Sequence, residues 1–128
     1  MTGQGDDLMA DIVVKAAYGS VVEDEEEGML FVGFAAGEDA DEGYVLFRQP
    51  LSGGPVWFEV NDENFGAEEA VERVSRTGKG IEISLRPDQA QSFGWAQSVA
   101  VRIGPDCEDA DAALEALQQM LGERWQAA

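Results

Sequence analysis

The sequence predicts an α+β domain, mainly an antiparallel β-sheet meander with a C-terminal α-helix packed on one face. Short segments with apolar residues at alternate positions recur from residue 12 to residue 103, and acidic or glycine-rich turns separate them. Apolar residues at helical spacing dominate the C-terminal segment. With 128 residues, of which 45% are hydrophobic, the chain fits one domain. We expect this domain over residues 11–128, after a flexible polar lead-in at residues 1–10.

The first two strands are predicted on either side of an acidic turn. Residues 12–18 alternate, with Ile12, Val14, Ala16 and Tyr18 on one face. Five consecutive carboxylates at residues 23–27 precede Gly28, and their mutual repulsion favours an exposed turn. The following segment, residues 29–36, is apolar at both alternating positions, which predicts a central strand covered on both faces.

Two more strands complete the predicted meander. A second acidic turn, Glu38–Gly43, precedes a strand at residues 44–48. A turn rich in proline and glycine, Pro50–Pro55, then leads into a strand at residues 56–60. Four strands in series indicate an antiparallel arrangement.

The middle of the chain is less regular. Residues 61–69 are polar and are expected to form a loop. Val71 and Val74 are three apart, which suits either a helical turn or a bulged strand at residues 70–76. The glycines of Thr77–Gly80 predict a tight hairpin that leads into a strand with Ile81, Ile83 and Leu85 on one face.

A short helical turn, one more strand and a long helix are expected to close the domain. Proline near the start and glycine at the end place the turn at residues 87–94, and alternation places the strand at residues 98–103. Asp106 can cap the helix. Acidic residues 108, 109 and 111 lie near the positive, N-terminal end of the helix dipole, and Arg124 lies near its negative, C-terminal end, so both interactions are favourable. Its apolar face comprises Ala110, Ala113, Leu114, Leu117, Met120, Leu121 and Trp125.

The charge of the chain restricts its partners. Twenty-six Asp and Glu against eight Lys and Arg give a formal net charge of −18. This charge repels nucleic acids and anionic membranes, so we expect neither as a partner, and it attracts basic protein surfaces. The alternative is that the acidity serves solubility or a salt-rich habitat.

The residue inventory favours binding over catalysis. The chain has no histidine and one cysteine, which excludes histidine-based triads, the common zinc sites within one chain and an intrachain disulfide. Cys107 at a helix start could be a reactive thiol, but a buried small side chain is the commoner case. We therefore expect no enzyme, no cofactor and no metal. A carboxylate-dependent hydrolase and a calcium-binding module at Glu38–Gly43 remain alternatives.

The N-terminal segment does not resemble an export signal. Asp6 and Asp7 stand where a signal peptide would carry a basic stretch before an apolar run. No segment approaches the ~20 apolar residues of a membrane-spanning helix. The expected location is the cytoplasm.

Residues 56–66 have the composition of a binding site, because an apolar strand leads directly into carboxylates and amides. If Val56, Phe58 and Val60 face the core, then Trp57, Glu59 and Asn61 share the opposite face. An aromatic ring beside hydrogen-bond acceptors is typical of a binding hot spot. In the alternative interpretation, Trp57 lies under a neighbouring element, and Asn61 and Asp62 simply form a turn.

The same region carries a family resemblance. The succession of Tyr44–Arg48, Trp57–Glu63, Val71–Val74 and Gly80–Leu85 resembles immunity protein 10, a family of bacterial polymorphic-toxin immunity proteins. The resemblance covers roughly residues 11 to 121, and its most specific part is Glu59-Val60-Asn61-Asp62. The chain departs from the pattern at Ala70, where a glycine is expected.

The resemblance implies a cytoplasmic protein that binds and neutralises a cognate toxin domain. A nuclease with a basic cleft would suit the acidity of the chain. The residues expected to contact the partner belong to the strand and loop near Trp57 and to the two acidic turns: Trp57, Glu59, Asn61, Asp62, Glu63, Glu25, Glu26, Asp39 and Asp41.

Overall fold

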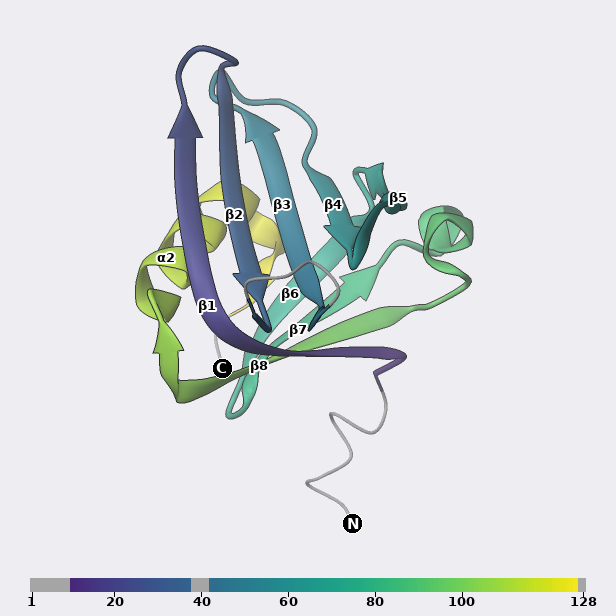
Figure 1. Cartoon of the computed structure of the whole chain (residues 1–128). Coiled ribbons are helices and arrows are strands. Elements are labelled where there is room, and N and C mark those ends of the chain that lie inside the picture. The colour runs from purple at the N-terminus through teal and green to yellow at the C-terminus, as the bar shows by residue number, and fades with distance from the viewer. Residues whose placement is uncertain (1–9, 38–41, 127–128) are drawn as a thin grey trace.

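The fold is a mixed β-sheet with one α-helix on one face (Figure 1). The computed structural model describes residues 10–37 and 42–126, so the predicted lead-in at 1–10 lies, except for Ala10, outside the described residues. The five N-terminal strands are β1 (Ile12–Asp24), β2 (Met29–Ala35), β3 (Tyr44–Pro50), β4 (Trp57–Val60) and β5 (Asp62–Glu68). The remaining elements are β6 (Val71–Thr77), β7 (Gly80–Leu85), η2 (Pro87–Phe93), β8 (Ser98–Glu108), α2 (Ala110–Leu121), η3 (Gly122–Arg124) and β9 (Trp125–Gln126).

The sheet consists of two antiparallel meanders joined by a parallel pair. The strand order is β5-β4-β3-β2-β1-β8-β7-β6-β9. Strands β1 to β5 pair antiparallel in sequence, as do β6 to β8. The β1–β8 and β6–β9 pairs are parallel, so the sheet is mixed, although most of its strand pairs are antiparallel as predicted; the prediction of one continuous meander was wrong. The physical reason is that a strand can pair along both of its edges. One edge of β1 pairs with β2, and sequence alternation gives no sign of which later strand pairs with the other edge.

Strand β1 belongs to both meanders. Its C-terminal part, from Tyr18, pairs with β2, and its N-terminal part, Ile12–Ala16, pairs with Val99–Ile103 of β8. The register shifts between Ala16 and Tyr18, and β1 bends strongly along its length in Figure 1. The extra residues at this shift, 104–107, belong to β8, and such an irregularity locally interrupts the ladder and changes its twist.

One hydrophobic core lies between the two meanders and α2. In Figure 1, β6 and β7 pass behind β3 and β4, and α2 lies behind β1 and β2. Phe58 lies between Phe47 and Phe93, with ring centroids 4.9 Å and 5.7 Å away. Helix α2 contributes its predicted stripe, of which Ala113, Leu114, Leu117, Met120 and Leu121 are buried. The predicted packing of the C-terminal helix on one face of the sheet is therefore confirmed.

In the middle of the chain, one predicted segment was wrong, and one that the sequence left open is decided. Residues 61–69 do not form a loop, because Asp62–Glu68 is an edge strand paired with β4. Its polar sequence fits an edge strand, since charges discourage further pairing. Residues 71–77 form a strand whose register shifts between Val71 and Arg73, which is the bulged-strand alternative. The short helical turn before Gly94 is confirmed as η2.

The C-terminal helix begins and ends differently from the prediction. Asp106 and Cys107 belong to β8, and the residue that precedes α2 is Asp109, at φ 60°. Arg124 lies in η3, and Trp125 pairs with Val74 in β9 instead of extending the helical stripe. Helical spacing cannot distinguish these ends, because a residue just beyond Gly122 can satisfy the period while the backbone has already left the helix.

The prediction that β2 is covered on both faces was also wrong. Val32 and Phe34 are buried in the core, whereas Met29, Phe31 and Ala35 on the opposite side are only half-buried. Helix α2 and the second meander both lie on the core side of β1–β5. An apolar sheet face is therefore left partly open to solvent.

Gly19 permits the close contact of β1 with α2. A Cβ atom at this position would lie 2.9 Å from the Asp109 carbonyl oxygen and 3.0 Å from Ala113 Cβ. We predict that Gly19→Ala lowers the free energy of unfolding by about 1–3 kcal/mol, because the start of α2 must shift. Urea unfolding measures the change. Gly104→Ala is the control, since a Cβ atom there meets nothing within 4 Å. Equal stability of the two variants would contradict the prediction.

Candidate functional site

The open side of β1–β5, which we call the outer face, carries side chains in ordered rows. The strand register places Val22, Phe31, Arg48 and Trp57 in one row across four strands. The next row comprises Ser20, Gly33, Leu46, Glu59 and Gly66, and a third comprises Tyr18, Ala35 and Tyr44. Alternation along each strand then assigns all these side chains to the side opposite the buried Val32 and Phe47.

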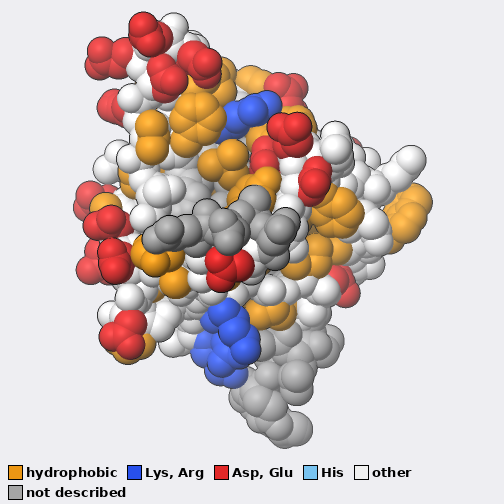
Figure 2. Space-filling model, in the orientation of Figure 1, with side chains coloured by type: hydrophobic (Ala, Val, Ile, Leu, Met, Phe, Trp, Pro, Cys, Tyr) orange, Lys and Arg blue, Asp and Glu red, His pale blue; other side chains and the backbone are white. Residues whose placement is uncertain are grey.

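The outer face is apolar at its centre and acidic around it. Val22 is 52% exposed and Tyr18 36%, while Phe31, Leu46 and Trp57 are half-buried. Figure 2 looks onto this face and shows hydrophobic side chains over β1 to β3, a basic group beside them, and acidic side chains above and to the right. Contiguous exposed apolar surface with a polar rim is typical of a protein-binding site.

A buried carboxylate organises the part of this face near β4. Glu59 is 5% exposed, and its two oxygens each accept a hydrogen bond. The Tyr44 hydroxyl donates to Oε2 at 2.5 Å, and the Trp57 indole Nε1 donates to Oε1 at 2.7 Å. Glu59 therefore positions Tyr44 and Trp57, and its predicted contact with a partner stays a prediction.

Trp57 is held from several directions. The Arg48 guanidinium carbon lies 4.7 Å from the indole ring centroid, on the neighbouring strand β3. On the β5 side, a Cβ atom on Gly66 would lie 2.8 Å from Trp57 Cζ2 and 2.7 Å from Glu59 Cβ. Glycine at position 66 is therefore needed for the indole to lie across β5. A preorganised aromatic ring of this kind loses little conformational entropy when a partner binds.

Asn61 connects β4 to β5 and is exposed, so its predicted contact with a partner stays a prediction. Its backbone N–H donates to the Tyr44 carbonyl, and its Oδ1 accepts from the Tyr44 backbone N–H, both at 3.0 Å. Its φ of 66° lies in the left-handed region that asparagine tolerates. The interpretation of this segment as a turn is therefore correct for Asn61.

The other predicted contact residues are acids at the margin. Asp62 and Glu63 are exposed at the start of β5, where the Asp62 carboxylate accepts from the Asn64 backbone N–H at 2.7 Å. Glu25 and Glu26 are exposed in the turn between β1 and β2. Asp39 and Asp41 lie outside the described residues. The structure thus places Trp57 and Glu59 in contact and distributes the described acids around the outer face.

Trp95 was missed by sequence reasoning. This side chain is 70% exposed, and its φ of 70° is uncommon for a bulky residue. Its backbone N–H donates to the Ala90 carbonyl at 2.8 Å, so the chain is pinned in this conformation after η2. The signal available in the sequence was a large aromatic residue directly after the glycine that ends a helical turn. Strained backbone of this type often occurs at functional sites.

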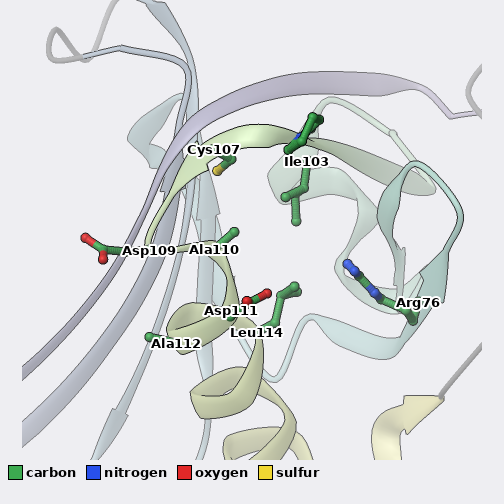
Figure 3. Close-up of a pocket in the computed structure, with 10 residues that line it drawn as sticks. Arg76, Ile103, Cys107, Asp109, Ala110, Asp111, Ala112 and Leu114 are labelled. Carbon is green, nitrogen blue, oxygen red and sulfur yellow. The ribbon is translucent and has the colours of Figure 1, made fainter.

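A pocket of about 520 Å³ lies between α2 and the second meander, away from the outer face (Figure 3). Arg76 extends toward it from β6, whereas the Asp109 carboxylate points away from it. Burial, and then the charges of Asp109 and Glu108, raise the pKa of the Cys107 thiol in its lining. A raised pKa keeps this thiol protonated at neutral pH, which does not favour a nucleophilic role.

The acidic residues form no evident metal site in the described part of the chain. Within residues 10–37 and 42–126, no group of three or more Asp, Glu or Cys side chains could hold a metal ion. Glu59 is the buried carboxylate of these residues, and hydrogen-bond donors, not a second carboxylate, meet its oxygens. No helix in the same ranges is long and apolar enough to cross a membrane.

No family model, curated protein or solved structure matches this chain. The function is therefore inferred from the geometry of the site.

The Tyr44–Glu59 hydrogen bond generates a pH-dependent prediction. Burial, the hydrogen bond to Glu59 and nearby carboxylates raise the pKa of Tyr44 well above its ordinary value. The folded protein then keeps this proton when the unfolded chain has lost it, so the stabilisation is complete below pH of about 10 and declines as the pH rises above it. We expect Tyr44→Phe to cost about 1–3 kcal/mol at pH 7, because Glu59 loses a donor. The cost should shrink as the pH rises above about 10.

Urea unfolding of wild type and Tyr44→Phe at several pH values tests this expectation. Stability curves that stay parallel over the whole range would show that Tyr44 has no shifted titration.

A second prediction concerns whether the exposed Trp95 side chain contributes to the stability of the fold. Since its ring is mostly exposed and its backbone is strained, we expect Trp95→Gly to change the free energy of unfolding by less than about 1 kcal/mol. Phe93→Ala, two residues earlier and 1% exposed, should cost about 3–5 kcal/mol. Chemical denaturation compares the two. A large loss for Trp95→Gly would mean that the ring stabilises the fold.

Proposed function

We propose that this protein is a cytoplasmic immunity protein that binds a cognate bacterial toxin domain through its outer face and so neutralises it. The observation that supports the proposal is an open aromatic and aliphatic sheet face with acids at its margin. Val22, Phe31 and Leu46 supply the centre of the interface, and Trp57 is a preorganised ring beside them. Burial of such a centre supplies the binding energy, and the margin excludes water around it.

The charge indicates the kind of toxin. Glu25 and Glu26 on one side, and Asp62 and Glu63 on another, are exposed in a chain with a formal net charge of −18. Complementary fields accelerate association and disfavour acidic competitors. A nuclease toxin carries a basic cleft for its substrate, and an acidic protein can occupy that cleft. We therefore propose a basic toxin domain, with a nuclease as the leading class.

The product of the gene directly upstream is the natural test partner. Its C-terminal domain should arrest growth when expressed alone, and co-expression of this protein should restore growth. Calorimetry with the purified domain should give an affinity of roughly 1–100 nM that weakens as salt is added. A lack of both binding and protection would refute the proposal.

The outer face itself is tested by a matched pair of substitutions on β1. Val22→Asp places a carboxylate on the outer face, and Val21→Asp places one on the opposite side of the same strand. The native side chains are similarly exposed, Val22 at 52% and Val21 at 40%. We expect Val22→Asp to weaken toxin binding at least about tenfold, because a charge must be desolvated at the centre of the interface. Val21→Asp should leave the affinity near that of wild type.

The two variants carry the same added charge, so general electrostatic attraction cannot distinguish them. Circular dichroism and thermal unfolding verify that both are folded. Equal affinities of the two variants would show that binding uses another surface.

A further inference from the structure

Arg48 is a basic residue within the apolar part of the outer face. It lies on β3 between Phe31 on β2 and Trp57 on β4, and it is half-buried. Its guanidinium stacks on the Trp57 ring at 4.7 Å. Stacking fixes the plane of the guanidinium but uses none of its five N–H donors.

The nearest buried carboxylate does not neutralise Arg48. The two oxygens of Glu59 accept from Tyr44 and Trp57 instead. Among the residues that the structure describes, none accepts a hydrogen bond from the Arg48 guanidinium and none forms an ion pair with it. Within residues 10–37 and 42–126, these donors therefore have no acceptor and can be offered to a partner.

A partner that covers the outer face removes solvent from the guanidinium. A guanidinium buried without an acceptor carries a large desolvation penalty, whereas a carboxylate that meets it in a two-pronged pair restores the hydrogen bonds and neutralises the charge. A purely apolar or purely basic covering surface is therefore rejected at this point. Specificity arises from that rejection as much as from attraction.

We infer that Arg48 is the specificity-determining residue of the outer face and that the partner presents a carboxylate to it from within an otherwise basic surface. The inference rests on the proposed function and adds the charge pattern of the partner. The outer face has one cation among apolar side chains and acids at its margin. The complementary partner surface has one carboxylate among apolar side chains and basic residues around them. Arg48 thereby selects one basic protein among many.

The direction of the effect of Arg48→Gln tests this inference. The substitution makes the chain more negative by one charge, so attraction to a basic partner as a whole would strengthen binding. If Arg48 meets a carboxylate, the affinity for the upstream-encoded toxin domain should instead fall at least about 30-fold. Arg48→Lys keeps the charge without the planar fork and should give an intermediate loss.

Arg73→Gln is the matched control. Arg73 is exposed on β6, in the other meander, and its substitution changes the net charge equally. We expect Arg73→Gln to bind as well as wild type or slightly better. Thermal unfolding verifies that each variant is folded, since the lost stacking on Trp57 should cost little stability.

A selection identifies the partner residue. Toxin-domain variants that regain binding to Arg48→Glu should carry an Asp or Glu replaced by Lys or Arg. Wild-type binding together with an unchanged or higher affinity of Arg48→Gln would overturn the inference and leave the proposed function intact. Failure of the wild type to bind the domain would overturn both.

Discussion

Strand β1 pairs with β2 along its C-terminal part and with β8 along its N-terminal part, and the positions of all other elements depend on this double pairing. The register of the β1–β8 pair shifts after Ala16, β1 bends along its length, and the second meander lies behind the first. Gly19 then lets α2 approach β1 on the same side. Because α2 and the second meander both lie on the core side, the outer face of β1–β5 is not covered by another described helix or strand.

The open face is partly apolar but internally ordered. Glu59 binds the Tyr44 hydroxyl and the Trp57 indole, while Gly66 provides the space in which the indole lies. Removing either donor is costly, since one oxygen of the buried Glu59 carboxylate would then lack a partner. The network therefore fixes the orientation of Trp57 before any partner arrives, and Arg48 is fixed with it by stacking. Preorganisation of both residues reduces the entropy lost on binding.

The net charge opposes both folding and self-association. A formal charge of −18 on 128 residues produces repulsion within the folded chain and between two copies of it. The acids at residues 23–27 are placed at an exposed turn, where solvent and salt screen them. Arg48 stands apart from them, among apolar side chains of the sheet. In the proposed complex, the acids would steer a basic partner and Arg48 would determine whether it fits.

The sequence by itself determined the strands with strict alternation, the short turn before Gly94 and the stripe of α2, because local periodicity reports which side of an element is buried. It also singled out Trp57 and Glu59. Tertiary structure alone decided that β8 lies beside β1, that the polar residues 62–68 form an edge strand, and that Cys107 is in a strand. Pairing of distant strands leaves no local signal, since a strand edge offers the same hydrogen bonds to any partner. For the same reason, the apolar residues of β2 could not reveal that one of their two sides would remain partly open to solvent.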